Sequence, residues 1–466
     1  MRFFRSLAAA AVLLLSSAAP VLAWSDPAPT SNWQAEVDRV VRAVLASTGV
    51  PSASIAVVKD GRIAYVRAYG DAALQPRNPA RPAMRYAIGS ISKQFTAAAI
   101  LLLAQDHKLS LDDPVGRFLP GLTRGDEVTV RQLLSHTSGY QDFWPQDYVP
   151  PFMLQDITAQ AILDRWARKP LDFEPGTQYQ YSNTGYTAAG LIVEKAGGVA
   201  LMRLLRERVF GPLKMASVFN VDESRLPESD PTGYIRYGLG PLRMAPKEGK
   251  GWLFAAGELA MTAEDLARWN ISVIDQSLLA PASYAEMQTE VRLKNGLGIQ
   301  YGLGLGVTSR SGHRGLAHGG EVSGFTANNL ILPDDRAAVS VLTNQDAVEA
   351  SSEIAAKIAR IAVAPDSSAA EKRARAVFEG LQRGKLDRSQ LTANAGSYFT
   401  EQAMRDLAAS LAPLGKPTQF KQTDERDRGG MKFRNFEVKF AKRTLLVWER
   451  DMPDGKIEQY QVMARD

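Results

Sequence analysis

Apolar and polar positions alternate along the chain with periods that change between helix and strand. Residues 31–46 place four valines on one helical face, which predicts an amphipathic helix. Two runs rich in β-branched and aromatic residues follow and flank Asp60-Gly61, a pair typical of a β-hairpin. Residues 90–107 are almost all helix formers, and their apolar stretch 97–103 predicts that this helix is buried.

Strand patterns return later in this larger segment. We expect strands over residues 301–307, 325–332 and 337–343, and a helix over 349–363. Residues 110–290 mix helices with long loops rich in proline and glycine. Strands at both ends with helices between them predict an α+β fold, in which one antiparallel sheet is closed by both ends of the segment and flanked by helices.

A linker-like Pro-Asp-Ser-Ser sequence at residues 365–368 precedes a C-terminal tail. Apolar residues recur with helical spacing over 374–381 and 404–411, and strand-like runs follow between 436 and 463. The tail therefore predicts a small α+β domain of about a hundred residues. We expect three parts, namely residues 1–23, 24–364 and 365–466.

The first residues read MRFFRSLAAAAVLLLSSAAPVLA, with two arginines, an apolar stretch and small residues before the end of the run. This order is typical of a cleaved signal peptide. A membrane anchor needs roughly 20 apolar residues, and this stretch is shorter. We expect cleavage after Ala23, no stable membrane anchor afterwards, and a secreted or periplasmic protein.

Composition narrows the possible functions. The net charge of +5 is scattered, and no basic tract with interleaved aromatic residues points to nucleic acid. The chain has no cysteine, so a cysteine nucleophile and thiolate metal sites are excluded. Its four histidines form no metal-binding motif. We expect no cofactor, no metal and no nucleic acid partner.

Ser90 and Lys93 stand three residues apart at the start of the predicted buried helix. This spacing puts both on one helical face. A lysine in a dry site loses its proton more easily and can activate a serine hydroxyl. Alone, the S-x-x-K pattern is more often a serine cap followed by a surface lysine.

Two further motifs follow. Tyr181 and Asn183 belong to a Tyr-Ser-Asn triplet: a tyrosine near a lysine ammonium ionises more easily and can carry a proton, and an asparagine can hold a lysine and a substrate amide. In His318-Gly319-Gly320, the glycines let a ligand approach a strand whose N–H completes an oxyanion hole. Alone, these motifs are also typical of a polar turn and a glycine-rich loop.

In this order, the three motifs resemble the serine β-lactamase and penicillin-binding-protein superfamily. The tyrosine in the triplet resembles the class C β-lactamase branch, which includes family VIII esterases, D-alanyl-D-alanine carboxypeptidases and D-aminopeptidases. The stretches YAIGSISKQFTAAAILLL, VTVRQLLSHTSGY and FEPGTQYQYSNTGY are similar to this family, and the resemblance covers residues 31–364. It implies a β-lactamase-like fold. The tail resembles the cone-shaped, nuclear-transport-factor-like modules that follow such domains.

The resemblance implies that Ser90 is the acylated nucleophile and that Lys93 and Tyr181 share general-base and general-acid work. Asn183 would orient Lys93 and the substrate. His136 suggests a Ser-His-Asp triad, but the resemblance implies a structural role for it. Of the nearby aromatic residues, Tyr140 and Trp144 either wall the cleft or belong to a plain hydrophobic loop.

For the third motif, the resemblance implies an oxyanion hole formed by the N–H groups of Ser90 and Glu321, beside Gly319 and Gly320, with His318 on the cleft wall. Lactamases usually carry lysine at this position, where it helps bind the carboxylate of a penicillin. Histidine is near neutral at pH 7 if unperturbed. We therefore expect an esterase or peptidase to fit at least as well as a lactamase.

These observations predict an exported serine hydrolase that forms an acyl-enzyme with a small-molecule or peptide substrate, through an ester or amide bond. One alternative is a β-lactamase or a penicillin-binding D-alanyl-D-alanine carboxypeptidase. Another is a catalytically weak sensor or binding protein on the same fold.

Overall fold

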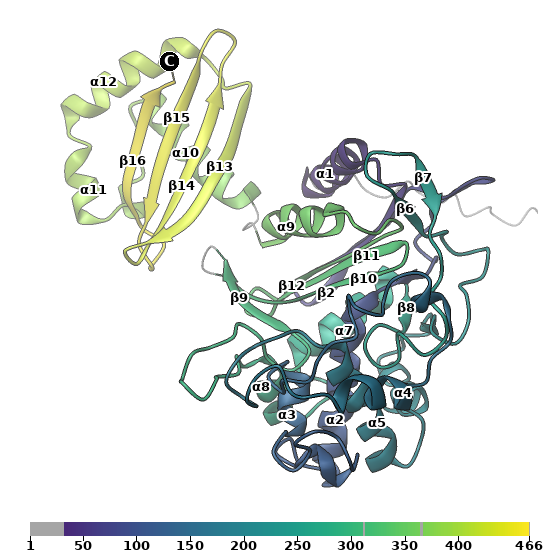
Figure 1. Cartoon of the computed structure of the whole chain (residues 1–466). Helices are drawn as coiled ribbons and strands as arrows, with labels where there is room; N and C mark the ends of the chain where they lie inside the picture. Colours follow the sequence, from purple (N-terminus) through teal and green to yellow (C-terminus); the bar gives the residue numbers. More distant parts are fainter. Residues whose placement is uncertain (1–31, 311–312, 364–366, 466) are drawn as a thin grey trace, which may run out of the picture.

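A computed structural model describes residues 32–310, 313–363 and 367–465 of the chain (Figure 1). The predicted signal peptide lies outside these residues. No helix within the described ranges combines the length and the apolar character needed to cross a bilayer.

A seven-stranded antiparallel sheet organises the larger unit, residues 32–363. Its strand order is β3-β2-β1-β12-β11-β10-β9, so β1 pairs directly with β12 and the two ends of the unit close the sheet, as the sequence predicts. The strands are β1 (Ser52–Lys59), β2 (Arg62–Leu74), β3 (Arg77–Pro79), β9 (Gly306–Arg310), β10 (His313–Val322), β11 (Phe325–Leu332) and β12 (Ala337–Thr343). The α+β fold class is confirmed.

Helices cover both faces of this sheet (Figure 1). On one face, α1 (Asn32–Thr48) and α9 (Ala350–Val363) pack their apolar stripes against the strands and one another. On the other face lie α7 (Ala263–Asp275) and the larger helical region. Each amphipathic helix buries its apolar stripe and leaves its charged side in water.

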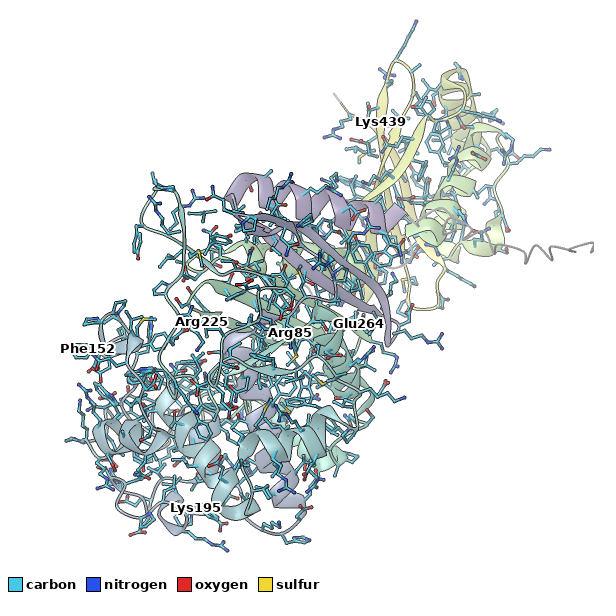
Figure 2. All side chains as sticks on the ribbon, turned by 90° about the vertical axis from the view of Figure 1, so that its right-hand side faces the viewer. Arg85, Phe152, Lys195, Arg225, Glu264 and Lys439 are labelled. Carbon is cyan, nitrogen blue, oxygen red and sulfur yellow. The ribbon has the colours of Figure 1, made fainter. Side chains whose placement is uncertain are left out.

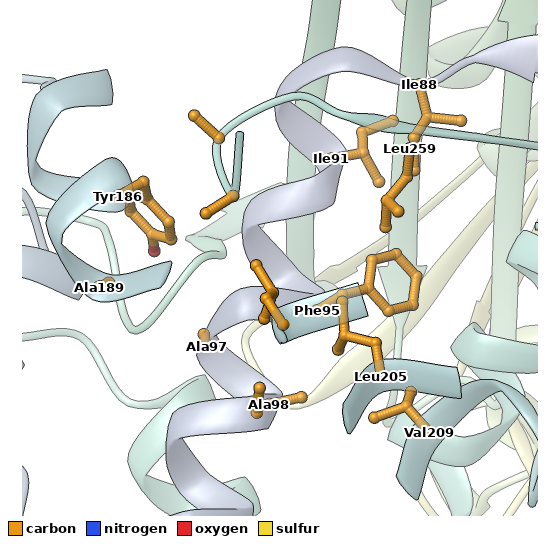
Figure 3. Close-up of a cluster of buried hydrophobic side chains, with 14 of the residues drawn as sticks. Ile88, Ile91, Phe95, Ala97, Ala98, Tyr186, Ala189, Leu205, Val209 and Leu259 are labelled. Carbon is orange, nitrogen blue, oxygen red and sulfur yellow. The ribbon is translucent and has the colours of Figure 1, made fainter. Parts of the chain in front are cut away.

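The helix α2 (Lys93–Gln105) runs through the helical region and is buried along nearly its whole length. Figure 3 shows Phe95, Ala97 and Ala98 of α2 among residues such as Tyr186 and Leu205. Because α2 is apolar all round, it forms a central element that other helices surround. Its neighbours include α5 (Asn183–Gly197) and α6 (Leu201–Leu205).

Short elements complete this unit. They are α3 (Val130–Leu134), α4 (Ala159–Ile162), α8 (Pro281–Gln288), two π-helical turns (Leu163–Ala167 and Arg206–Phe210), a small sheet of β4 (Tyr86–Ala87), β8 (Leu259–Met261) and β5 (Phe219–Asn220), and a hairpin of β6 (Tyr234–Arg236) and β7 (Leu242–Met244). Long loops join them, and one carries Phe152, which is about half exposed at the surface (Figure 2).

The C-terminal module packs three helices on a four-stranded antiparallel sheet of order β13-β14-β15-β16. Its own core is built around Phe378, Phe436 and Val447. The elements are α10 (Ser367–Gln382), α11 (Ala393–Tyr398), α12 (Glu401–Leu411), β13 (Gln419–Arg428), β14 (Met431–Lys439), β15 (Thr444–Asp451) and β16 (Ile457–Ala464). We expected two helices; α11 is additional, and so is the polar strand β13.

Candidate active site

Ser90 lies in a single 3-10 turn, η1 (Gly89–Ser92), that leads directly into α2. The side chains on either side, Ile88 and Ile91, are fully buried and anchor the turn in the core (Figure 3). The Ser92 hydroxyl accepts a hydrogen bond from the Leu259 amide in β8, 3.1 Å away. Ser90 itself stays partly exposed and faces a cleft.

Lys93 occupies the next helical turn and is completely buried. Its Nζ lies 3.0 Å from Ser90 Oγ, 2.8 Å from Asn183 Oδ1 and 2.8 Å from the Ala256 carbonyl oxygen. Burial lowers the pKa of Lys93 to about 7, although the carboxylate of Asp142 acts in the opposite direction. Near neutral pH, a substantial share of Lys93 is therefore the free amine, which can accept the proton of Ser90.

Asn183 is held in place by the start of α5. The preceding Ser182 caps this helix by accepting from the Gly185 amide at 3.1 Å. Asp142 accepts from the Asn183 backbone amide at 2.9 Å and from Asn183 Nδ2 at 3.0 Å. The second contact turns the amide oxygen of Asn183 towards Lys93.

Asp142 was not found by sequence reasoning. It lies in a loop with no recognisable motif, and only the fold brings it behind Asn183. Burial raises the pKa of Asp142 to about 6, although Lys93 lowers it. A carboxylate at this depth is a source of negative charge that stabilises the protonated form of Lys93.

Tyr181 lies over Lys93, with the lysine Nζ 4.9 Å from the centre of its ring. Burial raises the pKa of Tyr181 above its ordinary value, and a hydrogen bond with Ser90 acts in the opposite direction. The expectation that a nearby lysine eases ionisation of this tyrosine is not met, because burial is the largest influence on the pKa of Tyr181 and, within the described residues, the only group that lowers it is Ser90. Tyr181 is thus a protonated hydroxyl beside Ser90, suited to donate a proton.

Glycines bring the third motif, His318-Gly319-Gly320, against η1, the turn that carries Ser90 and that we call the nucleophile turn. A Cβ on Gly320 would lie 1.8 Å from the Ile88 carbonyl oxygen, and one on Gly89 would lie 2.6 Å from the amide nitrogen of Glu321. Only glycine fits at either position. The backbone amides of Ser90 and Glu321 therefore meet at this contact, as an oxyanion hole requires.

The strand β10 has a free edge at this motif. Its pairing with β9 runs from His313 to Ala317, whereas its pairing with β11 continues to Val322. Within the described residues, the segment from His318 onward has no strand partner on the side of β9. Peptide groups on this edge remain available to a ligand.

His318 is buried in the cleft wall, and both of its ring nitrogens are engaged. Nδ1 lies 2.5 Å from the Gly319 carbonyl oxygen and Nε2 lies 2.9 Å from the Tyr301 hydroxyl. Because a carbonyl only accepts, Nδ1 carries the hydrogen and Nε2 accepts from Tyr301. Burial lowers the pKa of His318 to about 4, with a further contribution from Lys93, so the ring is neutral at pH 7.

His136 does not contact Ser90 in any hydrogen bond within the described residues. Its Nδ1 accepts from the Ser182 amide at 3.1 Å, and its ring lies 4.2 Å from that of Tyr181. Burial holds the pKa of His136 well below its usual range. The neutral ring supports the Tyr-Ser-Asn segment, which agrees with a structural role.

The cleft in front of Ser90 has a volume of about 690 Å³, which suits a small ligand. Trp144 lines it and is 56% exposed, whereas Tyr140 is buried in the core and donates to the Thr123 carbonyl. Site residues that sequence reasoning proposed and that line it are Ser90, Tyr181, Asn183, His318, Gly319, Gly320 and Glu321. Further aromatic lining, not predicted, comes from Phe143, Tyr148, Tyr237 and Trp252.

Comparisons with known proteins agree with this geometry. The Beta-lactamase family model matches residues 37–364, and the chain belongs to this family. It is 32% identical to a D-aminopeptidase of Cereibacter sphaeroides over 307 residues, which are 64% of this chain and 57% of that protein. A D-aminopeptidase of Brucella anthropi is 28% identical over 322 residues, 68% of this chain and 60% of that protein. The chain thus spans little more than half the length of these relatives.

Solved structures show the same architecture. The D-amino acid amidase from Ochrobactrum anthropi SV3 in complex with D-phenylalanine matches with a TM-score of 0.62 and 25% identity, over 70% of this chain and 98% of that one. The octameric penicillin-binding protein homologue from Pyrococcus abyssi matches with a TM-score of 0.61 and 23% identity, over 93% of this chain and 96% of that one. The second likeness concerns the fold alone.

Proposed function

We propose that the protein is a serine hydrolase that cleaves an amide or ester bond through an acyl-enzyme at Ser90. One observation carries the proposal: Lys93 Nζ lies 3.0 Å from Ser90 Oγ, and burial lowers the pKa of this lysine to about 7. A serine hydroxyl needs an adjacent base to become a nucleophile, and this is the only buried lysine within the described residues.

The reaction follows from the contacts. Lys93 takes the Ser90 proton as Oγ attacks the substrate carbonyl, and the amides of Ser90 and Glu321 stabilise the oxyanion. Tyr181 donates a proton to the leaving nitrogen or oxygen and is reprotonated through Lys93. In the second half, water attacks the acyl group with the proton transfers reversed.

Amide substrates of the D-amino-acid type are favoured by similarity. Two relatives described above are named D-aminopeptidases, and one of the matched structures is a D-amino acid amidase. Penicillins fit less well, because neutral His318 offers no charge to their carboxylate and both of its ring nitrogens are already bonded. We expect ready turnover of short esters and of D-aminoacyl amides, and weak or absent turnover of β-lactams.

Labelling with a fluorophosphonate, followed by peptide mass spectrometry, tests the nucleophile. We expect the label on the peptide that contains Ser90 and none in Ser90→Ala, with Ser410→Ala, at an exposed position of α12, as a control that keeps the label. A screen of esters, D-aminoacyl amides and nitrocefin then tests the substrate class. A kcat/KM for nitrocefin above that for every ester and amide would overturn the assignment.

Export is part of the same proposal and rests on the N-terminal sequence alone. The arginines, the apolar stretch and the small residues before Ala23 support cleavage at that point. N-terminal sequencing of the protein from its native host should give Trp24 as the first residue. A retained Met1 would contradict export.

A further inference from the structure

The cleft continues past the nucleophile along the free edge of β10. Ser323 and Val322 line it beyond the motif, and Asp346 and Glu349 follow in the connection from β12 to α9. Together with Glu321, these last two form what we call the acidic end of the cleft. No lysine or arginine lies among the residues that line the described cleft.

The distance from this acidic end to Ser90 follows from strand geometry. Gly320 contacts the nucleophile turn, and the Gly324 amide donates to Asp346 Oδ2 at 2.8 Å. Four residues of extended chain span about 13 Å. Because the chain turns at Ser323, the Asp346 carboxylate lies on the order of 10 Å from the reacting carbonyl.

Asp346 has an unused acceptor. Its side chain is only 7% exposed, and within the described residues its Oδ1 has no hydrogen-bond partner. The neighbouring carboxylates differ: Glu321 accepts from the Ala347 amide at 2.8 Å, and Glu248 accepts from the Ser323 amide at 2.8 Å. A buried carboxylate oxygen without a donor costs free energy unless a ligand supplies one.

The negative charge of Asp346 adds a second reason to expect a positively charged partner. Burial raises the pKa of Asp346 to about 6, opposed by the Gly324 amide and reinforced by Glu321 and Glu248. At pH 7 the carboxylate is therefore mostly ionised, in a negative field. A cation is the chemical group that relieves both the missing donor and the repulsion.

We infer that the Asp346 carboxylate, within the acidic end of the cleft, binds an ammonium group of the substrate about 10 Å from the bond that is cleaved. This inference rests on the proposed function and adds a substrate class to it. The α-ammonium of an aminoacyl amide is two bonds from the carbonyl and cannot reach Asp346. The site selects acyl chains or short peptides with a remote amine.

Two pairs of p-nitrophenyl esters test the site in the full chain. The long pair is the ester of omega-aminooctanoic acid and its analogue with methyl in place of ammonium, and the short pair is the ester of gamma-aminobutyric acid and its methyl analogue. We expect the ammonium to raise kcat/KM about tenfold in the long pair, since a charged hydrogen bond is worth that much or more, and not in the short pair. Equal rates within the long pair would overturn the inference.

Two variants that each remove one negative charge test whether the preference for the ammonium ester depends on Asp346. Asp346→Asn should reduce the preference for the long ammonium ester to near one, while kcat/KM for the methyl ester stays the same. Glu349→Gln removes the same charge from an exposed position of the acidic end and should leave the preference intact. An equal loss of this preference in both variants would indicate that the combined negative charge of the acidic end attracts the ammonium, and that Asp346 is not a specific binding site.

A binding measurement distinguishes a failure of this inference from a failure of the proposed function. If no ester is turned over and Ser90 stays unlabelled, the proposed function fails. Calorimetry of Ser90→Ala with omega-aminooctanamide, against nonanamide, still reports on Asp346. Tighter binding of the amine supports the site, and equal binding refutes it.

Discussion

Replacing Asp142 by asparagine tests whether Lys93 is the base that limits acylation. Lys93 must be neutral to accept the Ser90 proton, so log kcat/KM should rise with unit slope and level off near pH 7, the pKa of Lys93. Asp142 raises that pKa. Removing its charge should therefore lower the pKa and move the rising limb to lower pH.

The size of the shift follows from the contacts. A single amide, that of Asn183, separates Lys93 from Asp142, which puts the charges about 7 Å apart. With an effective dielectric constant of about 20, the Coulomb energy is roughly 2 kcal/mol, so the pKa of Lys93 should fall by roughly 1 to 2. The plateau should fall too, because an asparagine nitrogen facing Asn183 Nδ2 donates where Asp142 accepted.

The assay is kcat/KM for one neutral ester between pH 5 and 9, in wild type, Asp142→Asn and Glu349→Gln. The position of the limb is independent of the plateau height, so a partly damaged variant still gives an answer. The limb of Glu349→Gln should coincide with that of wild type. A limb that stays in place or moves to higher pH in Asp142→Asn would show that another group titrates.

Three further outcomes are expected. Tyr181→Phe should lower kcat/KM by roughly 10²-fold, as for other general acids, without changing the thermal unfolding midpoint; near-normal turnover would contradict its role. Gly320→Ala should lower acylation by roughly 10²-fold or more, because its Cβ would lie 1.8 Å from a carbonyl oxygen of the nucleophile turn, whereas Gly319→Ala, whose Cβ would meet nothing closer than 3.9 Å, should be tolerated. A chain ending near Ala364 should still be labelled at Ser90; a folded truncation without labelling would show that the C-terminal module completes the site.

Strong local patterns predicted much of the fold. The β11 and β12 strands begin and end where the apolar runs do, because a buried antiparallel strand bounded by turn residues has a clear sequence pattern. The predicted strand over 301–307 instead begins at Gly306, since Gly304 adopts a positive φ of 74° in a turn. Strand β13 was missed because its sequence, QFKQTDERDR, is almost entirely polar.

The candidate site shows the same contrast between residues that a local sequence pattern marks and residues that only the fold brings into place. The motifs predicted that Ser90, Lys93 and Asn183 share one site, and in the structure Lys93 contacts both of the other two residues. Asp142 and Tyr301 act through the tertiary arrangement alone, and no local pattern marks them. The direction of the Tyr181 pKa likewise depends on burial, which a sequence motif does not encode.

Neutral imidazoles at two buried positions make the stability of the folded state depend on pH. His136 and His318 both have a pKa lowered by burial, that of His318 to about 4, whereas the unfolded chain binds these protons at about pH 6.5. The unfolded state therefore takes up more protons at these positions as the pH falls. The ring of His318 costs about 1.4 kcal/mol of stability per pH unit between about 6.5 and 4, and the ring of His136 acts in the same direction. Buried carboxyls with a raised pKa, such as that of Glu258, act in the opposite direction, so the contribution of His318 is measured as a difference between two proteins. As the pH falls from about 6.5 to about 4, the free energy of unfolding in urea should fall less in His318→Gln, which keeps a hydrogen-bonding side chain that does not titrate, than in wild type. The burial that keeps both rings neutral thus also makes part of the stability of the fold depend on pH.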